Sequence, residues 1–376
     1  MRRRKITLII TLLLVLVIPL IGCQDTADTP DATDDTDADH AMSFVLYDSS
    51  LLGSENRTDD MLLPLYRADW DIDTGDISYN DTSMMTVEGK FGYESISRWD
   101  GYNRFLINEN LAKAIEFGSD IKLAADERDP TVFYGEGITM QLTDDTADLV
   151  FDDGEELSFN IEPGKAPEPL DGPYLANIIG LGATDEFVTI IYKIMQKEDG
   201  SVPLFCVRYD REDGSVTWSE TIELTEHDTS DVAVYAWFNA CYFDGVRLYY
   251  SGINIWCYDT STNEVYELER ITKSVENLVP GYTRETLFDD PLVSNVMGGM
   301  NGTAICSMTL VDTDTGEWIG VCYAIAEASL IGVLARSGET LTTYDANLQK
   351  AEETVIDLPL GALGMKFPVP NYRFEG

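Results

Sequence analysis

Residues 232–271 read VAVYAWFNACYFDGVRLYYSGINIWCYDTSTNEVYELERI, and this stretch decides the fold that the sequence predicts. Short runs rich in Tyr, Trp, Val and Ile alternate with turn residues, first Asp244-Gly245 and later Ser-Thr-Asn. β-Branched and aromatic side chains favour strands, and Asp-Gly favours a tight hairpin turn in which both central residues take positive φ. Four strands joined by turns within about forty residues have the size of one blade of a β-propeller.

A looser form of this unit recurs along the chain: an apolar strand, a turn that begins with Asp and ends with Gly or Asn, and then an aromatic residue. The turns are Asp71–Gly75, Asp210–Gly214, Asp259–Asn263 and Asp312–Gly316, and the aromatic residues are Tyr79, Trp218, Tyr266 and Trp318. In such a turn the Asp side chain accepts backbone N–H bonds, and Gly or Asn takes the left-handed conformation. We therefore expect each Asp to cap its own turn and each aromatic ring to be at least partly buried.

Other copies of the unit are less regular. A final copy begins at Tyr344-Asp345, and looser copies lie near Phe105–Phe117 and at Asp144–Phe151. Helical periodicity is scarce, and only two short helices are predicted, at Glu109–Phe117 and near Thr272–Leu278. The fold class expected from these patterns is all-β.

The best copies, Asp71–Tyr79 and Asp210–Trp218, resemble the repeats of quinoprotein-like β-propellers, which carry Asp-x-x-Thr-Gly and a Trp four residues later. The resemblance extends loosely over about residues 65–357 and implies a β-propeller of about seven four-stranded blades. Residues 42–48, MSFVLYD, would close the ring as an extra strand. Two β-sandwich domains are the alternative, because regular strand spacing fits both. The Pro-rich loop Glu162–Pro173 is then an insertion or a boundary between subdomains.

The N-terminus has the layout of an export signal. Basic residues 2–5 precede Ile6–Ile21, an apolar run of 16 residues. A membrane-spanning helix needs roughly 17–25 apolar residues, so residues 1–22 are predicted to be a cleaved signal peptide. The motif Leu20-Ile21-Gly22-Cys23 resembles the lipobox of bacterial lipoproteins, which implies that Cys23 receives a diacylglycerol. The alternative is an ordinary signal peptide with a chance Cys.

Residues 23–41 are predicted to be an acidic tether between the lipid and a β-propeller domain over residues 42–376. Residues 24–41 hold seven Asp and four Thr, with no basic residue and no large hydrophobe. Such a segment cannot bury enough apolar surface to offset its ordering entropy. A solvated spacer is therefore favoured over a metal-binding tail.

The charge of the chain limits its partners. Without the four basic residues of the signal, 21 basic residues face 67 acidic ones, a formal charge of −46. Nucleic acid is not an expected partner, because affinity for it comes from cationic side chains. Binding to bare anionic headgroups is not expected for the same reason, so contact with the membrane is expected only through the N-terminal lipid. The predicted location is the cell envelope, on the extracytoplasmic face of the membrane.

The cysteines are predicted to be free core thiols. Apart from Cys23 there are five, Cys206, Cys241, Cys257, Cys306 and Cys322, so they cannot all pair. Most lie inside apolar runs, where Cys behaves as a small hydrophobe. A Cys241–Cys257 bridge is the alternative. No Cys-x-x-Cys motif occurs, and no His lies near enough in sequence to complete a zinc site.

Signals of catalysis are scarce. The two His residues are His40, in the predicted tether, and His227, in a polar loop. Gly-x-Ser-x-Gly, His-Glu-x-x-His and P-loop motifs do not occur. Quinoproteins use adjacent cysteines and calcium around their quinone, and no adjacent cysteines occur, so no cofactor is expected. Asp71–Gly75 and Asp312–Gly316 match a calcium loop only in part, and hairpin chemistry is favoured over a metal.

The favoured function is non-enzymatic. An envelope-anchored propeller would present loops to a protein or glycan ligand, or serve as a scaffold within an envelope assembly. The alternative is an extracytoplasmic polysaccharide hydrolase or lyase that uses carboxylates in the propeller funnel. A funnel lined by acidic residues with a Tyr or His would favour the enzyme, whereas an exposed aromatic patch would favour partner binding. The sequence singles out no catalytic residue.

Overall fold

The computed structural model describes residues 40–52, 61–87, 121–123, 132–143, 146–160, 178–193, 202–224, 241–251, 254–278, 281–284, 294–312 and 314–367. In this part of the chain the fold is all-β, with strands β1–β24, one 3-10 helix, η2 (Ser49–Leu52), and one α-helix, α5 (Glu269–Glu276). Helix α5 overlaps the one predicted near Thr272–Leu278, whereas Glu109–Phe117 lies outside the described residues. All described residues belong to one unit, Asp39–Gly376. None of their helices is long and apolar enough to cross a membrane.

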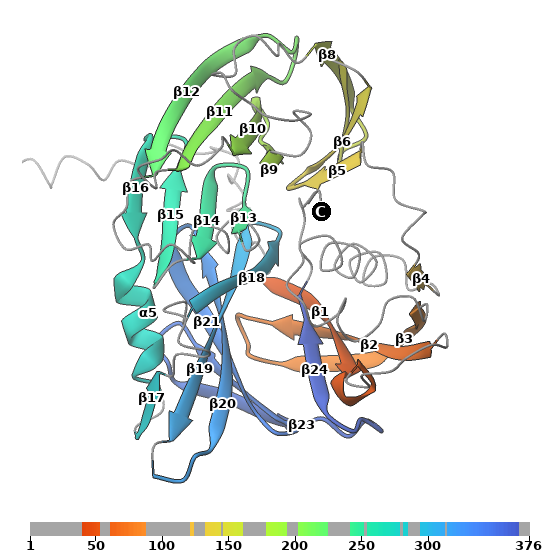
Figure 1. Cartoon of the computed structure of the whole chain (residues 1–376), viewed down its shortest axis with the longest axis vertical. Coiled ribbons are helices and arrows are strands. Elements are labelled where there is room, and N and C mark those ends of the chain that lie inside the picture. Colours follow the sequence, from red (N-terminus) through yellow and green to blue (C-terminus); the bar gives the residue numbers. More distant parts are fainter. Residues whose placement is uncertain are drawn as a thin grey trace, which may run out of the picture. The chain divides into compact units, whose positions relative to one another are not determined.

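The strands form five sheets, which we name A to E in chain order (Figure 1). Sheet A has the order β24 (Leu363–Lys366), β1 (Ala41–Asp48), β2 (Met61–Asp71), β3 (Ile77–Val87), β4 (Ile121–Leu123). Sheet B contains β5 (Val132–Gly135), β6 (Ile138–Thr143), β7 (Thr146–Phe151) and β8 (Glu156–Asn160). Sheet C contains β9 (Ile178–Ala183), β10 (Phe187–Lys193), β11 (Val202–Asp210) and β12 (Val216–Leu224). Sheets B and C are four-stranded and antiparallel, the strand number predicted for one blade.

Sheet D is the four-stranded unit read from residues 232–271. It contains β13 (Cys241–Phe243), β14 (Arg247–Ser251), β15 (Ile255–Asp259) and β16 (Glu264–Glu267). Sheet E has seven strands: β17 (Tyr282–Arg284), β18 (Ser294–Met300), β19 (Thr303–Asp312), β20 (Trp318–Ala326), β21 (Ser329–Ser337), β22 (Thr340–Asp345) and β23 (Lys350–Val355). In sheet A, β1 pairs with β2 on one side and with β24 on the other. The first and last described strands therefore share one sheet.

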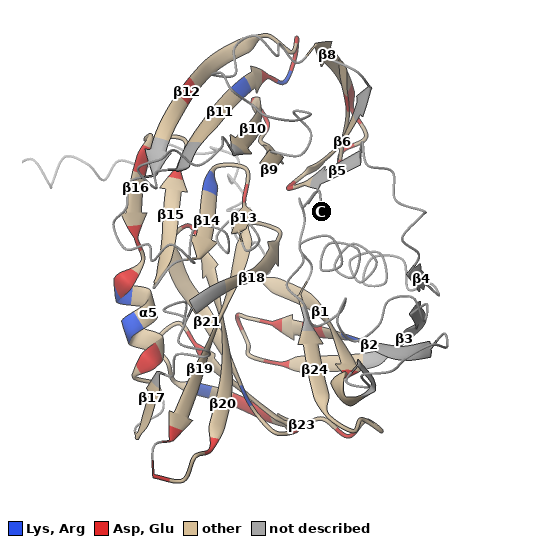
Figure 2. Ribbon diagram, in the orientation of Figure 1, with Lys and Arg blue, Asp and Glu red and all other residues tan. Residues whose placement is uncertain are grey.

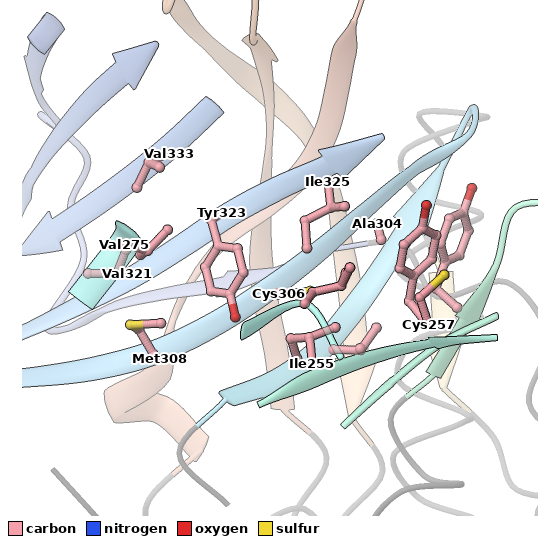
Figure 3. Packing of buried hydrophobic residues seen from close by; sticks show 14 of the residues in the cluster. Ile255, Cys257, Val275, Ala304, Cys306, Met308, Val321, Tyr323, Ile325 and Val333 are labelled. Carbon is pink, nitrogen blue, oxygen red and sulfur yellow. The ribbon is translucent and has the colours of Figure 1, made fainter. Parts of the chain in front are cut away.

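Four buried hydrophobic clusters lie between the sheets, and each takes side chains from two of them. Representative members are Leu149 and Val188 for B and C, Ile191 and Leu248 for C and D, Tyr249 and Tyr323 for D and E, and Trp70 and Leu334 for A and E. Figure 3 shows the cluster between D and E. Successive side chains of a strand point to opposite faces. Sheets C, D and E therefore each pack one face on one neighbour and the other face on a second.

Glycines let the first strands of sheets B, C and D approach backbone to backbone. A Cβ atom built on Gly135 of β5 would lie 2.4 Å from the Leu181 carbonyl oxygen of β9. A Cβ atom built on Gly182 of β9 would lie 2.6 Å from Cα of Gly245, which follows β13. Both distances are too short for a real Cβ atom, so no other residue fits without displacement. A parallel bridge between Glu136 and Gly182 joins B to C along the same line.

The hairpin turn after β13 differs from its prediction. Only Gly245 has positive φ, +92°, and Asp244 does not, so the expectation of positive φ at both residues is wrong. The Asp244 backbone N–H donates to the Arg247 carbonyl, 3.1 Å, which makes Gly245 and Val246 the central pair. The carboxylate of Asp244 accepts the Val246 N–H at 2.8 Å, and this bond holds Asp244 before the turn instead of inside it.

The five described cysteines are buried and form no disulfide bond with one another, as predicted for core thiols. Cys241 packs in the cluster between C and D, whereas Cys257 packs in the cluster between D and E. The two thiols lie on opposite faces of sheet D, so the alternative of a Cys241–Cys257 bridge is wrong. Burial raises the pKa of Cys206 to about 12, which keeps this thiol protonated and unreactive.

Regular pairing begins earlier than the predicted domain boundary at residue 42. Strand β1 starts at Ala41, and the His40 carbonyl accepts the Ile72 N–H at 2.8 Å. The His40 N–H donates to the Asp73 carboxylate at 3.2 Å. Backbone pairing needs no large side chain, so the composition of the acidic segment gave no sign that its last two residues join the sheet.

Candidate functional site

The four predicted Asp turns have one geometry, and each lies in a different sheet. Their backbone carbonyls accept an N–H from the residue four positions later, in the pairs Asp71–Gly75 (2.8 Å), Asp210–Gly214 (3.0 Å), Asp259–Asn263 (2.8 Å) and Asp312–Gly316 (2.7 Å). The last residue of each turn is left-handed, with φ of +85° at Gly75, +69° at Gly214, +59° at Asn263 and +74° at Gly316. The turns join β2 to β3, β11 to β12, β15 to β16 and β19 to β20.

The Asp carboxylates bind the backbone of their own turns. Each Oδ1 accepts a backbone N–H two or three residues later, from Thr74 to Asp71 (2.9 Å), Glu212 to Asp210 (2.8 Å), Ser261 to Asp259 (2.8 Å) and Asp314 to Asp312 (2.8 Å). The N–H groups of Thr315 and Asp314 hold the pKa of Asp312 below its usual value. Within the described ranges no three His, Cys, Asp or Glu residues are placed to hold a metal ion. The geometry is that of hairpin capping.

The aromatic residues after these turns do not share one environment. Tyr79, Trp218 and Tyr266 are partly buried against the clusters between sheets. Trp318 is 48% exposed and belongs to none of the four clusters, so the expected packing against a neighbouring sheet is wrong for this residue. A Cβ atom on Gly316 or Gly320 would meet no atom of the described residues within 4 Å.

The less regular copies differ in register from their predictions. Phe105–Phe117 and Asp144 lie outside the described residues. The turn of sheet B follows β7, where the Gly154 N–H donates to the Phe151 carbonyl at 2.8 Å and Gly154 has φ of +85°. Phe151 therefore occupies the position that Asp holds in the other turns. The copy predicted over Asp144–Phe151 ends at the residue where the turn begins. In the final copy, the Asp345 carboxylate accepts the Asn347 N–H at 2.8 Å.

Two of the repeat turns are hydrogen-bonded to a neighbouring sheet. The Thr343 hydroxyl of β22 donates to the Gly75 carbonyl at 2.7 Å, which joins sheet E to the turn of sheet A. Arg208 of β11 donates to the Thr260 carbonyl at 3.1 Å, which joins sheet C to the turn of sheet D. Figure 2 shows the few Lys and Arg residues among many Asp and Glu residues at turns and strand ends.

Arg211 joins sheet C to the turn of sheet B. Its guanidinium lies 4.1 Å from the centre of the Phe151 ring and bonds the carboxylates of Asp153 and Glu155, the latter at 3.3 Å. Its side chain is only 13% exposed. An aromatic ring and two turn carboxylates thus enclose one arginine, an arrangement that combines charge with cation–π contact.

A second feature is a junction of carboxylates and tyrosines that the sequence did not reveal. Glu136, between β5 and β6, accepts the Tyr242 hydroxyl at 2.7 Å and the Gly302 N–H at 2.9 Å. The Gly302 N–H also donates to the Tyr242 oxygen at 3.1 Å. These three residues come from sheets B, D and E, so one carboxylate joins three sheets.

Asp244 is a second acidic group close to this junction. Its carboxylate accepts the N–H of Arg247 at 2.5 Å and the hydroxyl of Tyr249 at 3.4 Å, and its side chain is 5% exposed. Burial raises the pKa of Asp244, with its hydrogen bonds acting against that shift. Burial also raises the pKa of Glu136; the Tyr242 hydroxyl opposes the shift, and the charge of Asp244 adds to it.

The junction has groups that acid–base catalysis uses, a carboxyl of raised pKa and a tyrosine. Both oxygens of Glu136 are nevertheless engaged in bonds between sheets. The only sequence signal was a carboxylate followed by Gly after an apolar strand, at Glu136-Gly137 and Asp244-Gly245. That pattern is common in hairpins and does not identify a site. Cys23 and His227 lie outside the described residues.

Comparison with known proteins gives no family. No protein-family model matches the chain, and no curated protein is similar to it. Among solved structures, the crystal structure of BamB from Moraxella catarrhalis matches with a TM-score of 0.23 and 12% sequence identity, over 81% of this chain and 75% of that chain. A TM-score this low supports no argument about fold or function. Function is therefore inferred from the sequence and geometry of the chain itself.

Proposed function

We propose that this chain is a lipoprotein of the cell envelope, anchored through Cys23 on the extracytoplasmic face, whose sheets are the blades of a β-propeller. In this proposal the propeller is a non-enzymatic scaffold that binds a partner in the envelope. The anchor rests on the signal and the motif Leu20-Ile21-Gly22-Cys23. The propeller and its role as a scaffold rest on how the sheets are joined.

The main support for a propeller is that neighbouring sheets share hydrophobic clusters. Sheets B and C, C and D, D and E, and E and A each enclose a common cluster. In a pair of β-sandwiches each sheet packs on one partner and turns its other face to solvent. Sheets C, D and E bury both faces, which is expected of blades packed side by side around an axis.

The five sheets of the described residues are the candidate blades of this proposal. Six hairpins of the repeat lie in the described residues, at Asp71, Phe151, Asp210, Asp259, Asp312 and Asp345. Two of them belong to sheet E, but β20 pairs with β21, so its seven strands form one continuous sheet that packs on D and on A and counts as one blade. The further blades of a seven-bladed ring would have to come from residues outside the described ranges.

The scaffold role is supported by how the acidic groups are used. The carboxylates of Glu136 and Asp244 accept bonds from Tyr242, Gly302, Tyr249 and Arg247. Each of these bonds fixes a turn or joins sheets. The arginines of sheet C likewise join it to its two neighbours. That these polar groups bond one another and the backbone, within and between sheets, supports a structural role for them.

Anchoring is tested with Cys23→Ala in cells fed an alkyne-labelled fatty acid. The variant is expected to lose the lipid label and to remain an uncleaved precursor, because the acceptor thiol is absent. Cys206→Ala is the matched control, since Cys206 is a buried thiol of β11. It should keep the label. Retention of label and of membrane partition by Cys23→Ala would refute the anchor.

The second candidate is the extracytoplasmic polysaccharide hydrolase or lyase. The observation that favours it is the meeting of Glu136, Asp244 and Tyr242 at one junction. Its test is release of reducing or unsaturated sugars from a panel of anionic and neutral polysaccharides. An enzyme at this junction would show turnover that Glu136→Gln and Tyr242→Phe abolish. The scaffold proposal expects wild-type protein to release no more sugar than heat-denatured protein does.

A further inference from the structure

The chain has one Asn-Gly pair, and it forms the whole turn of the β18–β19 hairpin. Met300 pairs with Thr303, so only Asn301 and Gly302 lie between the two strands. Their φ angles are +51° and +74°, and a two-residue hairpin turn with both angles positive strongly favours Asn-Gly. Asn301 is exposed. The turn therefore places an asparagine amide in water directly before a glycine.

Asparagine before glycine is prone to deamidation, because glycine has no side chain to hinder the attacking nitrogen. In this reaction the Gly302 nitrogen gives up its proton to water or hydroxide and bonds to the side-chain carbonyl carbon of Asn301. The amide nitrogen leaves as ammonia. Water then opens the five-membered imide and leaves aspartate or isoaspartate in place of Asn301. The reaction needs only water, and its attacking group is a backbone nitrogen that has lost its proton.

The N–H of Gly302 is held by two acceptors. It donates to Oε1 of Glu136 at 2.9 Å and to the hydroxyl oxygen of Tyr242 at 3.1 Å. The Tyr242 hydroxyl in turn donates to the second oxygen of Glu136 at 2.7 Å, and the Tyr242 side chain is buried. Loss of the Gly302 proton would remove both of its hydrogen bonds at once, which makes the deprotonated nitrogen harder to form.

Charge acts in the same direction as these hydrogen bonds. A deprotonated nitrogen is an anion, and at Gly302 it would form beside the carboxylate of Glu136. A like charge at this range favours the protonated form of an acid. The charges of Asp244 and Asp152 also act on the Glu136 carboxylate, so the turns of sheets B and D add to the negative field around it. The junction therefore opposes the first step of deamidation.

We propose that Asn301 is a deamidation site and that the junction of Glu136 and Tyr242 guards it. While the junction is closed, Gly302 keeps its proton and the turn stays intact. When the junction opens, Asn301 is converted, and the change is one-way. Isoaspartate adds one carbon to the main chain, and a turn of two residues has no slack to absorb it, so the pairing of β18 with β19 would be disturbed. This inference does not rest on the scaffold function proposed above.

The test follows conversion of Asn301 by peptide mass spectrometry, in full chain that carries Cys23→Ala and is kept in mildly alkaline buffer. Deamidation replaces an amide by an acid, which changes the mass of the peptide that contains Asn301. A synthetic peptide of residues 298–305 is the unguarded reference. Conversion in the folded chain should be at least about tenfold slower than in the peptide, the combined worth of two hydrogen bonds. Equal rates would overturn the proposal.

Two substitutions open the guard in different ways. Glu136→Gln removes the negative charge and keeps an oxygen as acceptor, whereas Tyr242→Phe removes one acceptor and keeps the charge. Each should raise the rate of conversion about threefold or more above that of the parent chain, the worth of one hydrogen bond. A rate that falls in Glu136→Gln would show that the carboxylate takes up the proton and promotes the attack, and the guard would then be wrong.

Tyr249→Phe is the matched control. Tyr249 lies opposite Tyr242 in sheet D with the two rings stacked, and its oxygen accepts the N–H of Ala328, in another turn of sheet E, at 3.0 Å. Among the hydrogen bonds of the described residues, none joins Tyr249 to Gly302.

The control therefore loses the same kind of bond between sheets D and E and leaves the guard in place. Its rate, corrected like the others for the unfolded fraction measured by urea unfolding, should stay within about twofold of the parent chain. An acceleration equal to that of Tyr242→Phe would mean that general loosening of the two sheets sets the rate, and it would overturn the proposal.

Discussion

Gly182→Ala should damage the line along which sheets B, C and D meet. The added Cβ atom would lie 2.6 Å from Cα and 2.9 Å from the backbone nitrogen of Gly245, and 3.1 Å from a ring carbon of Phe243. Ordinary carbon contacts lie near 3.5–4.0 Å, so β9 and the turn after β13 would have to separate by about 1 Å. Overpacking of this kind costs about 1–3 kcal/mol. Because two of the three atoms belong to the backbone and cannot rotate away, we expect the upper end, about 3 kcal/mol.

Gly320→Ala is the matched control. Gly320 also lies inside a strand and its φ is not positive, yet a Cβ atom there meets nothing within 4 Å. The substitution should leave the free energy of unfolding unchanged or raise it by about 0.4–1 kcal/mol, because it reduces the freedom of the unfolded chain.

The measurement is urea unfolding followed by tryptophan fluorescence, with both substitutions made in chain carrying Cys23→Ala so that no lipid is attached. The difference between Gly182→Ala and Gly320→Ala should be at least about 2 kcal/mol. Equal stabilities would mean that β9 and the turn after β13 do not touch in solution. The close packing of sheets B, C and D at these glycines would then be wrong.

Two other predictions concern the partly exposed indoles and the three-sheet junction. Trp218→Ala should lower the free energy of unfolding by about 2 kcal/mol, because the Trp218 ring is partly buried and stacks with Arg208. Trp318→Ala should lower it by less than about 1 kcal/mol, because Trp318 is 48% exposed. Urea unfolding that gives the reverse order would contradict these environments. Burial raises the folded-state pKa of Glu136 above its usual 4.5, so its contribution to stability is full at lower pH and is lost as pH rises through the raised pKa. The Glu136→Gln variant has no carboxyl group to titrate at this position. Its free energy of unfolding relative to wild type should therefore rise from pH 4.5 toward neutrality and then level off. A difference that stays constant over this range would refute the raised pKa of Glu136.

Local features of the fold could be predicted from the sequence because they depend on few residues. The turns from Asp71 to Gly75 and from Asp210 to Gly214 need only a capping carboxylate and a residue that tolerates positive φ. The position of helix α5 and the burial of the core cysteines were predictable for the same reason, because each depends on a short run of residues. The register of the Asp244 turn was not, because Asp-Gly fits more than one position of a hairpin.

Features that depend on distant segments could not be predicted. The carboxylate of Glu136 and the N–H of Gly302 are 166 residues apart in the chain. Nothing near either residue indicates the other. The exposure of Trp318 depends on where the neighbouring sheets end, and its local pattern is the same as that of the buried copies. His40 looked like part of the tether because backbone pairing leaves no trace in composition.

The pairing of β1 with β24 sets the order in which the chain can become a finished body. The carboxylate of Asp48 accepts the Gly361 N–H at 2.7 Å, across 313 residues. Strand β1 therefore cannot gain its second partner until the far end of the chain has been synthesised. Until then one edge of β1 stays open, and afterwards β1 is hydrogen-bonded along both edges. In the proposed lipid-anchored form, tension on the N-terminal side would act on a strand that β2 and β24 hold together.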